Sequence, residues 1–293
     1  MRIIVIGSTG QLGTDLIRVL KNDHETIGLA HEDIEVTERD SCQVLRRYNP
    51  DVVINTAAFH DVDRCEEEPL EAFSVNAIGA KNVAEVCREI QAITVFISTD
   101  YVFDGSKMEP YTEEDIPNPI NTYGISKLAG ELYTSRNPKH YIVRVASLFG
   151  IAGARGKSGN FIEKMINKAR NNEQISVVDD MWMSPTYTVD AARTINAIIK
   201  SKAPFGIYHV TNAGFCTWFQ FAQEIFRQIG LRPHLTPIKT NQLRMKAQRP
   251  RYSVLTSIKL SKYGIKTRDW KQALNEYLIE KGHLSTSDAP VKL

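Results

Sequence analysis

The segment NTYGISKLAGE (121–131) places the phenol of Tyr123 four residues before the ammonium of Lys127. Helical periodicity puts these two side chains on one stripe with Gly130 and Thr134, opposite an apolar stripe of Ile125, Leu128, Ala129 and Leu132. A solvated helix face would explain this pattern. Acid–base chemistry would explain it too, because a nearby ammonium stabilises a phenolate and lowers the usual tyrosine pKa of about 10.

A second group of polar residues follows a run that reads as a buried strand, in FISTDYVFDG (96–105). Ser98 and Thr99 stand where this strand would end, and a hydroxyl there can hydrogen-bond a substrate carbonyl. With a hydride donor, these groups describe carbonyl reduction, in which Tyr123 gives the proton to oxygen and Thr99 polarises the carbonyl. The Tyr–Lys spacing alone is common by chance, so the prediction depends on the motifs that accompany it.

The sequence GSTGQLG places Gly7, Gly10 and Gly13 between an apolar first strand and a helix. Glycine permits tight turns and removes the Cβ that would obstruct a phosphate, and a helix N-terminus offers free N–H groups. This context predicts a dinucleotide pyrophosphate site, although a glycine turn without a ligand is the alternative.

The end of the second strand bears on the choice of cofactor. An acidic residue at the strand tip would favour NAD, whereas a basic one would favour NADP. Here the strand ends at Ala30–His31, and no aspartate stands at the tip. We therefore expect NADPH, with NADH as the alternative, and we expect Asp33 and Ile34 to flank the adenine.

Two polar features could serve either packing or the cofactor. The third strand ends in NTAAF (55–59), whose small residues would let a cofactor pass close to the backbone or would simply pack in a turn. Asn76 lies in an otherwise apolar helical segment. It could be a satisfied buried amide, or it could bind backbone near the active site.

Apolar runs alternate with amphipathic segments along the first half of the chain. This alternation predicts an α/β fold, a Rossmann-type doubly wound parallel sheet with helices on both faces. We expect residues 1–150, with a returning helix at about 186–203, to form the dinucleotide-binding domain. Residues 151–185 and 204–282 are expected to form a smaller mixed α/β substrate-binding lobe, and 283–293 a flexible tail.

Composition excludes several classes of protein. A net charge of +2 over 293 residues is too small to indicate nucleic acid or an anionic membrane as a partner. No apolar run approaches the ~20 residues of a membrane span. The four cysteines are scattered, with no CxxC, which argues against zinc and disulfides. We expect a cytoplasmic enzyme, monomer or homodimer, without a metal.

The order GxxGxxG, STDYVFDG, YGxSK resembles the extended short-chain dehydrogenase/reductase superfamily, and within it the dTDP-4-dehydrorhamnose reductases. The resemblance covers nearly the whole chain, through stretches such as PDVVINTAAF, VDRCE, GNFIEKM, SPTY, GIYHVTN and RPRYSVL. It implies NAD(P)H-dependent reduction of the 4-keto group of dTDP-4-dehydro-L-rhamnose, with a dTDP-sugar as the bound partner.

The resemblance also implies roles for individual residues. It assigns catalysis to Thr99, Tyr123 and Lys127. It implies that Gly10, Gln11 and Leu12 contact the cofactor pyrophosphate and that Ala57 and Ala58 lie along the cofactor. The candidate substrate-binding residues are Thr99, Asp100, Asn160, Trp182 and Arg249. An arginine suits a diphosphate, but a surface ion pair is the alternative for Arg249.

The chain departs from the family pattern on the substrate side. His60 stands where the family often has threonine, and Leu148 where it usually has tryptophan. The family's DQxGSPT is DDMWMSPT here, with Met181, Trp182 and Met183. Trp182 could cover the sugar instead, or it could be a packing residue. These changes bear on the identity of the sugar more than on the redox chemistry.

Some members of the family bind magnesium between subunits through glutamates. The corresponding positions here are Asp15 and Val189, which leave too few hard oxygen ligands for such a bridge. Two other functions remain open: another nucleotide-sugar reductase or epimerase, and a non-catalytic regulatory protein like the methionine adenosyltransferase β subunit. The Tyr–Lys pair does not distinguish the predicted reductase from an epimerase, because epimerases have the same pair.

Overall fold

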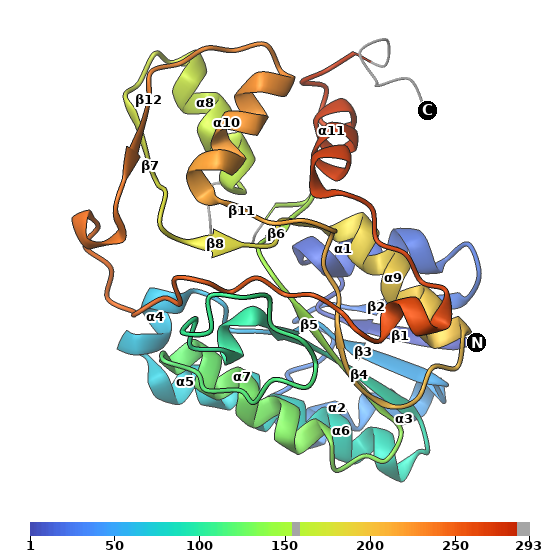
Figure 1. The fold of residues 1–293 in the computed structure, drawn as a ribbon. Helices are drawn as coiled ribbons and strands as arrows, with labels where there is room; N and C mark the ends of the chain where they lie inside the picture. The colour runs from blue at the N-terminus through green and yellow to red at the C-terminus, as the bar shows by residue number, and fades with distance from the viewer. Residues whose placement is uncertain (154–158, 286–293) are drawn as a thin grey trace.

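The computed structural model describes residues 1–153 and 159–285, so most of the tail expected at 283–293 lies outside the described residues. Six parallel strands form the central sheet, in the order β10–β5–β4–β3–β1–β2 (Figure 1). Their bounds are β1 Arg2–Ile6, β2 Glu25–Leu29, β3 Val52–Asn55, β4 Ile93–Thr99, β5 His140–Val145 and β10 Gly206–His209. The strand order reverses between β1 and β3, which makes a ligand-binding switch point there.

Helices cover both faces of the sheet. Along β1, Ile3 and Val5 pack in the core on one face with α1 (Gln11–Leu20) and α9 (Thr188–Lys200). Ile4 and Ile6 point into the core on the other face, which is covered by α2 (Arg39–Cys42), α3 (Val44–Tyr48) and α6 (Ala80–Glu89). Successive residues of a strand therefore pack into two buried cores, one on each face of the sheet. The predicted doubly wound fold is confirmed.

The apolar helical segment that contains Asn76 is divided into three elements. It forms α5 (Pro69–Phe73), a π-helical turn η1 (Ser74–Gly79) and α6. Within the π turn, the Asn76 amide accepts from the Phe59 N–H at 2.9 Å and donates to the Phe59 carbonyl at 3.0 Å. Its Nδ2 also donates to Ser126 at 3.0 Å. Asn76 is therefore both satisfied and bound to backbone beside the third strand, and π turns are often found at such sites.

Helix α7 (Thr122–Thr134) buries the stripe that carries Tyr123 and Lys127 and exposes its apolar stripe. Lys127 is 2% exposed, whereas Ile125 and Leu132 are 44% and 65% exposed. Close packing explains this orientation, because a Cβ on Gly130 would lie 2.3 Å from the carbonyl oxygen of Asn76. Only the stripe with this glycine can approach η1 and β4 so closely.

A smaller lobe lies above the carboxyl ends of the strands (Figure 1). Its elements are β6 Leu148–Phe149, α8 Phe161–Arg170, β7 Ile175–Val178, β8 Trp182–Met183, β9 Thr186–Tyr187, β11 Cys216–Thr217, α10 Trp218–Gln228, β12 Leu235–Ile238 and α11 Trp270–Glu280. An aromatic core that includes Phe149, Tyr187 and Phe221 holds it together. Among the described residues, no helix combines the length and apolarity needed to cross a membrane.

The segment expected as lobe from 204 onward is partly sheet. Strand β10 pairs with β5, from Gly206 opposite Tyr141 to His209 opposite Arg144. Leu260, in the short helix η4 (Leu260–Tyr263), packs into the core of the sheet. The local pattern of apolar residues does not say which sheet edge a strand joins.

Candidate active site

A cavity of about 860 Å³ opens at the carboxyl ends of the strands, between the sheet and the lobe. Its wall includes the glycine turn after β1, the NTAAF segment after β3 and the ends of β4 and β5. The lobe contributes Asn160, Phe161, Lys164 and Trp218. The volume is within the range of ligand and cofactor sites.

The glycine turn forms a cradle at the N-terminus of α1. Gly7 has a positive φ of 76°, and a Cβ on Gly13 would lie 2.1 Å from the Gly7 carbonyl oxygen. Gly10, Gln11, Leu12 and both other glycines line the cavity. The Gln11 side-chain oxygen is buried without a hydrogen-bond partner among the described residues. Such a cradle fits the diphosphate of a dinucleotide.

The end of the cavity near β2 differs in part from expectation. Ile34, Ala57 and Ala58 line it. Asp33 lies outside the wall, and its carboxylate accepts from the Ala30 N–H at 2.8 Å. Glu35 lines the cavity instead. Its carboxylate accepts from the N–H and the hydroxyl of Thr37, at 2.9 and 2.8 Å. A carboxylate two residues before a threonine is a recognisable local hydrogen-bonding pattern.

Thr99 ends β4, and α7 brings Tyr123 to the same wall of the cavity. Burial raises the pKa of Tyr123, although a hydrogen bond with the Thr99 hydroxyl opposes this shift. The Thr99 oxygen accepts from the Tyr101 N–H at 3.2 Å. A neutral phenol in this position keeps its proton over the ordinary pH range, which suits a proton donor.

Lys127 also lines the cavity, but its ammonium is hydrogen-bonded to the backbone of β4. Its Nζ donates to the Ile97 carbonyl at 2.6 Å and lies 4.1 Å from the centre of the Phe96 ring. Burial lowers its pKa to about 7, and the charge of Glu131 opposes this shift. The pKa of Tyr123 is raised and not lowered as predicted, because burial dominates for both side chains.

Behind Lys127 lies a buried ion pair that sequence reasoning missed. Glu131, one turn further along α7, pairs with Arg144 of β5 through bonds of 2.9 and 2.7 Å, and Ser98 also donates to it. Arg144 Nη1 lies 3.4 Å from His209 Nε2. Glu131 follows Lys127 at i+4 on the same stripe, and this spacing is the signal that could have found it.

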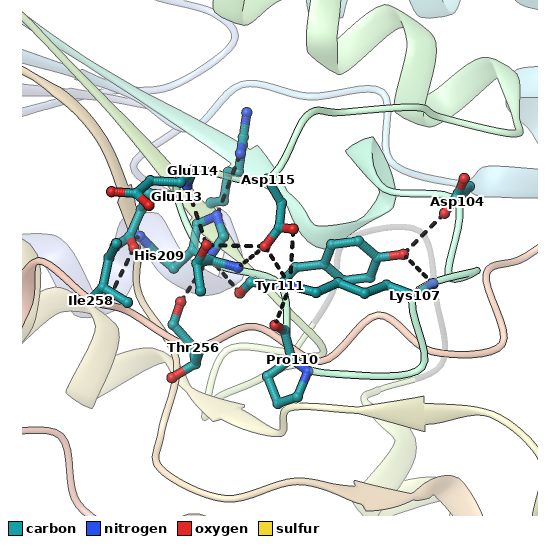
Figure 2. Close-up of polar contacts among 12 residues, drawn as sticks. Asp104, Lys107, Pro110, Tyr111, Glu113, Glu114, Asp115, His209, Thr256 and Ile258 are labelled. Atoms are coloured by element: carbon teal, nitrogen blue, oxygen red, sulfur yellow. Dashed lines mark hydrogen bonds and ion pairs between the residues drawn. The ribbon is translucent and has the colours of Figure 1, made fainter.

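The loop that carries Tyr111 and Glu113 contacts His209, the last residue of β10 (Figure 2). The Nδ1 atom of His209 lies 3.1 Å from the Tyr111 carbonyl oxygen and 3.0 Å from the Thr256 carbonyl oxygen. Glu113 accepts from the His209 N–H at 3.1 Å. Burial lowers the pKa of His209 to about 4, so the ring is neutral at pH 7. This network fixes Arg144 and, through it, the back of α7.

We expect Glu131→Gln to destabilise the protein by about 3–5 kcal/mol, because it leaves the Arg144 charge buried without its partner. Chemical denaturation followed by circular dichroism would measure the change. The matched control is Glu68→Gln, which breaks an exposed i,i+4 pair with Arg64 and should cost at most about 1 kcal/mol. Equal effects of the two substitutions would contradict the importance of the buried pair.

The other expected substrate contacts are only partly gathered at the cavity. Asn160 lines it, but its amide caps α8 by accepting from the Glu163 N–H at 3.1 Å, and it donates to Gly150 and Tyr277. Arg249 lies outside the wall, 18% exposed, in an ion pair with Asp63 at 3.1 Å. Arg249 therefore lies in an ion pair, and its contact with a sugar nucleotide stays a prediction.

Trp182 also lies outside this wall. Its ring meets that of Phe215 edge to face at 5.8 Å, and Phe215 in turn meets Tyr252 at 6.2 Å. Leu148, at the position of the family's tryptophan, does line the cavity. Lys164 and Trp218 are wall residues that the sequence analysis did not single out, because nothing in their local pattern distinguishes them from helix surface and packing.

The positions discussed for a metal are occupied by internal contacts. Asp15 accepts from the Thr188 hydroxyl and lies 3.1 Å from Arg18, and Val189 is buried. Within residues 1–153 and 159–285, no three His, Cys, Asp or Glu side chains are grouped so as to hold a metal ion.

The strand order, the glycine turn at the switch point and the Tyr–Lys helix beside a strand-end hydroxyl define an extended short-chain dehydrogenase/reductase. The family is identified by comparison with known sequences. The chain belongs to the RmlD substrate binding domain family, whose model matches residues 1–282.

Individual relatives are similar over their whole length. The dTDP-4-keto-6-deoxy-D-glucose reductase of Streptomyces niveus is 36% identical over 281 residues, covering 94% of this chain and 96% of the relative. A crystal structure of a dTDP-4-dehydrorhamnose reductase from Clostridium acetobutylicum is 40% identical with a TM-score of 0.91, covering 96% of this chain and 100% of that one. The Bacillus anthracis dTDP-4-dehydrorhamnose reductase, solved in complex with NADP, is 37% identical with a TM-score of 0.90, covering 95% and 99%.

Proposed function

We propose that this chain is an NAD(P)H-dependent reductase that converts dTDP-4-dehydro-L-rhamnose to dTDP-L-rhamnose. The observation that carries the proposal is the meeting of the glycine cradle, Thr99, Tyr123 and Lys127 in one cavity. Whole-length relatives named as reductases of dTDP-4-keto sugars support it.

The protein's own groups have separate tasks in this reaction. When bound, a reduced nicotinamide dinucleotide supplies the hydride. Tyr123 holds a proton on its phenol oxygen and donates it to the carbonyl oxygen as that oxygen becomes an alcohol. Lys127, charged below its pKa of about 7, lines the same cavity as Tyr123, and its positive charge would favour departure of that proton. The lobe side of the cavity keeps the reacting groups away from water.

For the cofactor, we propose binding by the glycine turn and by Ile34, Ala57 and Ala58, which line the same cavity. NADPH is the proposed dinucleotide, with NADH as the alternative, and the relative solved with NADP supports this choice. We further propose a cytoplasmic monomer or homodimer, in keeping with four buried free thiols.

A second sugar is a specific alternative. Leu148 replaces the family's tryptophan in the cavity wall, and the Streptomyces relative is named for dTDP-4-keto-6-deoxy-D-glucose. A smaller side chain at this position changes the space beside the sugar, so the same redox groups could serve a different 4-keto sugar.

The test is to offer the purified protein each of the two dTDP-4-keto sugars, generated in situ, and to follow oxidation of NADPH and NADH. We expect substrate-dependent oxidation, faster with dTDP-4-dehydro-L-rhamnose. Faster turnover of the 6-deoxyglucose derivative would move the assignment to that sugar. Absence of oxidation with both would refute the reductase and favour the non-catalytic alternative.

A further inference from the structure

Ser147 has a left-handed backbone conformation two residues after the end of β5, with a φ of 43°. In this region the Cβ of an L-residue crowds its own backbone, so glycine is the residue best suited to it. Ser147 is the one non-glycine residue with a positive φ that lines the active-site cavity, among those that the structure describes. The others are Asn49, Gln91, Met108, Asn172 and Lys202.

The turn at Ser147 has a different setting from most of the others. All of the others except Met108 follow the C-terminus of a helix by one or two residues, where a left-handed residue commonly ends the helix. Ser147 instead turns the chain from β5 into β6, so that Leu148 pairs with Thr186. The Ser147 carbonyl accepts from the Thr186 N–H at 3.2 Å. A glycine would make this turn with less strain, so the turn alone does not account for a serine.

The Ser147 hydroxyl is available to a ligand. The residue is half-buried, and Val145 and Leu148 on either side of it line the same cavity. Within residues 1–153 and 159–285 the hydroxyl makes no hydrogen bond, and it is not among the sealed side-chain oxygens that lack a partner. It therefore faces open space, where it can donate one hydrogen bond and accept two.

The strand order places this hydroxyl on the substrate side of the reacting groups. Val145 lies opposite Thr99 in the sheet, and the Cα of Ser147 is at most ~7 Å from that of Val145. Asp100, which accepts from the Thr99 hydroxyl at 2.9 Å, lines the same cavity. The glycine cradle follows β1, on the other side of β4 from β5. A sugar whose carbonyl meets Tyr123 therefore lies closer to Ser147 than a pyrophosphate in the cradle does.

We propose that the Ser147 hydroxyl hydrogen-bonds a ring hydroxyl of the sugar and so positions its keto carbon for reduction. The inference rests on the proposed function and adds a substrate-binding residue to it. No covalent bond changes at Ser147, and the proton that is transferred still comes from Tyr123. A site that hydrogen-bonds a substrate hydroxyl discriminates against ligands that lack it. The strained turn is retained because it carries this side chain into the cavity.

Two ligands separate the sugar from the nucleotide: dTDP-L-rhamnose carries both, and dTDP carries the nucleotide alone. Ser147→Ala keeps the Cβ and the strained turn but removes the hydroxyl. We expect its Kd for dTDP-L-rhamnose to rise by about 3–10-fold, the value of one hydrogen bond. Its Kd values for dTDP and for the dinucleotide should be unchanged. Calorimetric titration of the protein saturated with oxidised dinucleotide measures the first two, and titration of the free protein measures the third.

Ser147→Gly separates the hydroxyl from the backbone. Glycine accepts a positive φ, so its melting temperature should be no lower than that of the Ala variant. Its loss of affinity for dTDP-L-rhamnose should be the same. The matched control is Lys202→Gly, at a positive φ of 51° outside the cavity wall, which should leave all three affinities unchanged. Weaker sugar binding in the Gly variant alone would assign the effect to backbone flexibility and overturn the inference.

The remaining outcomes are also decisive. If Ser147→Ala weakened dTDP and dTDP-L-rhamnose equally, or weakened the dinucleotide, the hydroxyl would contact a different group and the inference would fail. Unchanged affinity for all three ligands would refute it too, and in each of these cases a wild-type protein that reduces a dTDP-4-keto sugar keeps the reductase proposal intact. A wild-type protein that reduces neither sugar would overturn the reductase proposal itself, so the two failures are distinguishable.

Discussion

Tyr123→Phe is expected to lower kcat by about 10²–10⁴-fold, the usual contribution of general acid–base catalysis. The substitution removes the only proton that Tyr123 can donate and keeps the ring that packs against Tyr101 at 6.0 Å. Fold and cofactor binding should be unchanged, since the glycine cradle lies on another element. Steady-state oxidation of the reduced dinucleotide measures the rate, and quenching of protein fluorescence measures its binding.

The matched control is Tyr133→Phe, on the same helix. Tyr133 lies outside the cavity wall and packs against Arg136. Loss of its hydroxyl should leave kcat close to the wild-type value. If Tyr123→Phe kept near-normal turnover, Tyr123 would not be the proton donor, and the reaction would need a different acid.

Lys127→Met is expected to remove activity and, at the same time, to stabilise the cofactor-free protein. Burial lowers the pKa of this lysine from 10.5 to about 7, and a difference of this size corresponds to on the order of 5 kcal/mol of destabilisation. Loss of the hydrogen bond to the Ile97 carbonyl leaves that oxygen unpaired and destabilises the variant by about 1–3 kcal/mol. A net gain in the free energy of unfolding at pH 6 is the expected result.

The sign with pH follows from proton binding. Between about pH 7 and 10.5, the unfolded chain binds a proton on Lys127 that the folded protein has released, so wild-type stability from this group increases with pH. The advantage of the Met variant is therefore largest below pH 7 and shrinks as pH rises towards 10. Denaturation of both proteins at several pH values measures this change. The control is Lys81→Met, which replaces a half-buried lysine in a weak i,i+4 pair with Glu85. A destabilised Met variant at pH 6 would contradict the prediction.

Local patterns in the sequence predicted most of the fold. The returning helix predicted at about 186–203 is α9, Thr188–Lys200, and the strand–turn–helix at the glycines lies at the switch point. These elements could be predicted because apolar runs and glycine spacing are encoded within about ten neighbouring residues. The family resemblance extended the prediction to a dinucleotide-dependent enzyme.

Contacts between distant segments were harder to predict. Asp33 and Glu35 are both acidic residues near the end of β2, and only Glu35 lines the cavity. Arg249 lies in an ion pair with Asp63, a residue 186 positions away. No periodicity records which of several charged side chains turns towards a cavity, because this depends on how the lobe packs against the sheet.

The sequence by itself determined the chemical groups, their order and the secondary structure that carries them. Only the tertiary structure decided that α7 turns its polar stripe inward and leaves Ile125 and Leu132 exposed. Hydrophobicity would favour the opposite face, but the missing side chain of Gly130 lets the other stripe approach η1. That close packing places Lys127 over the Ile97 carbonyl. It also brings Tyr123 within hydrogen-bond reach of Thr99.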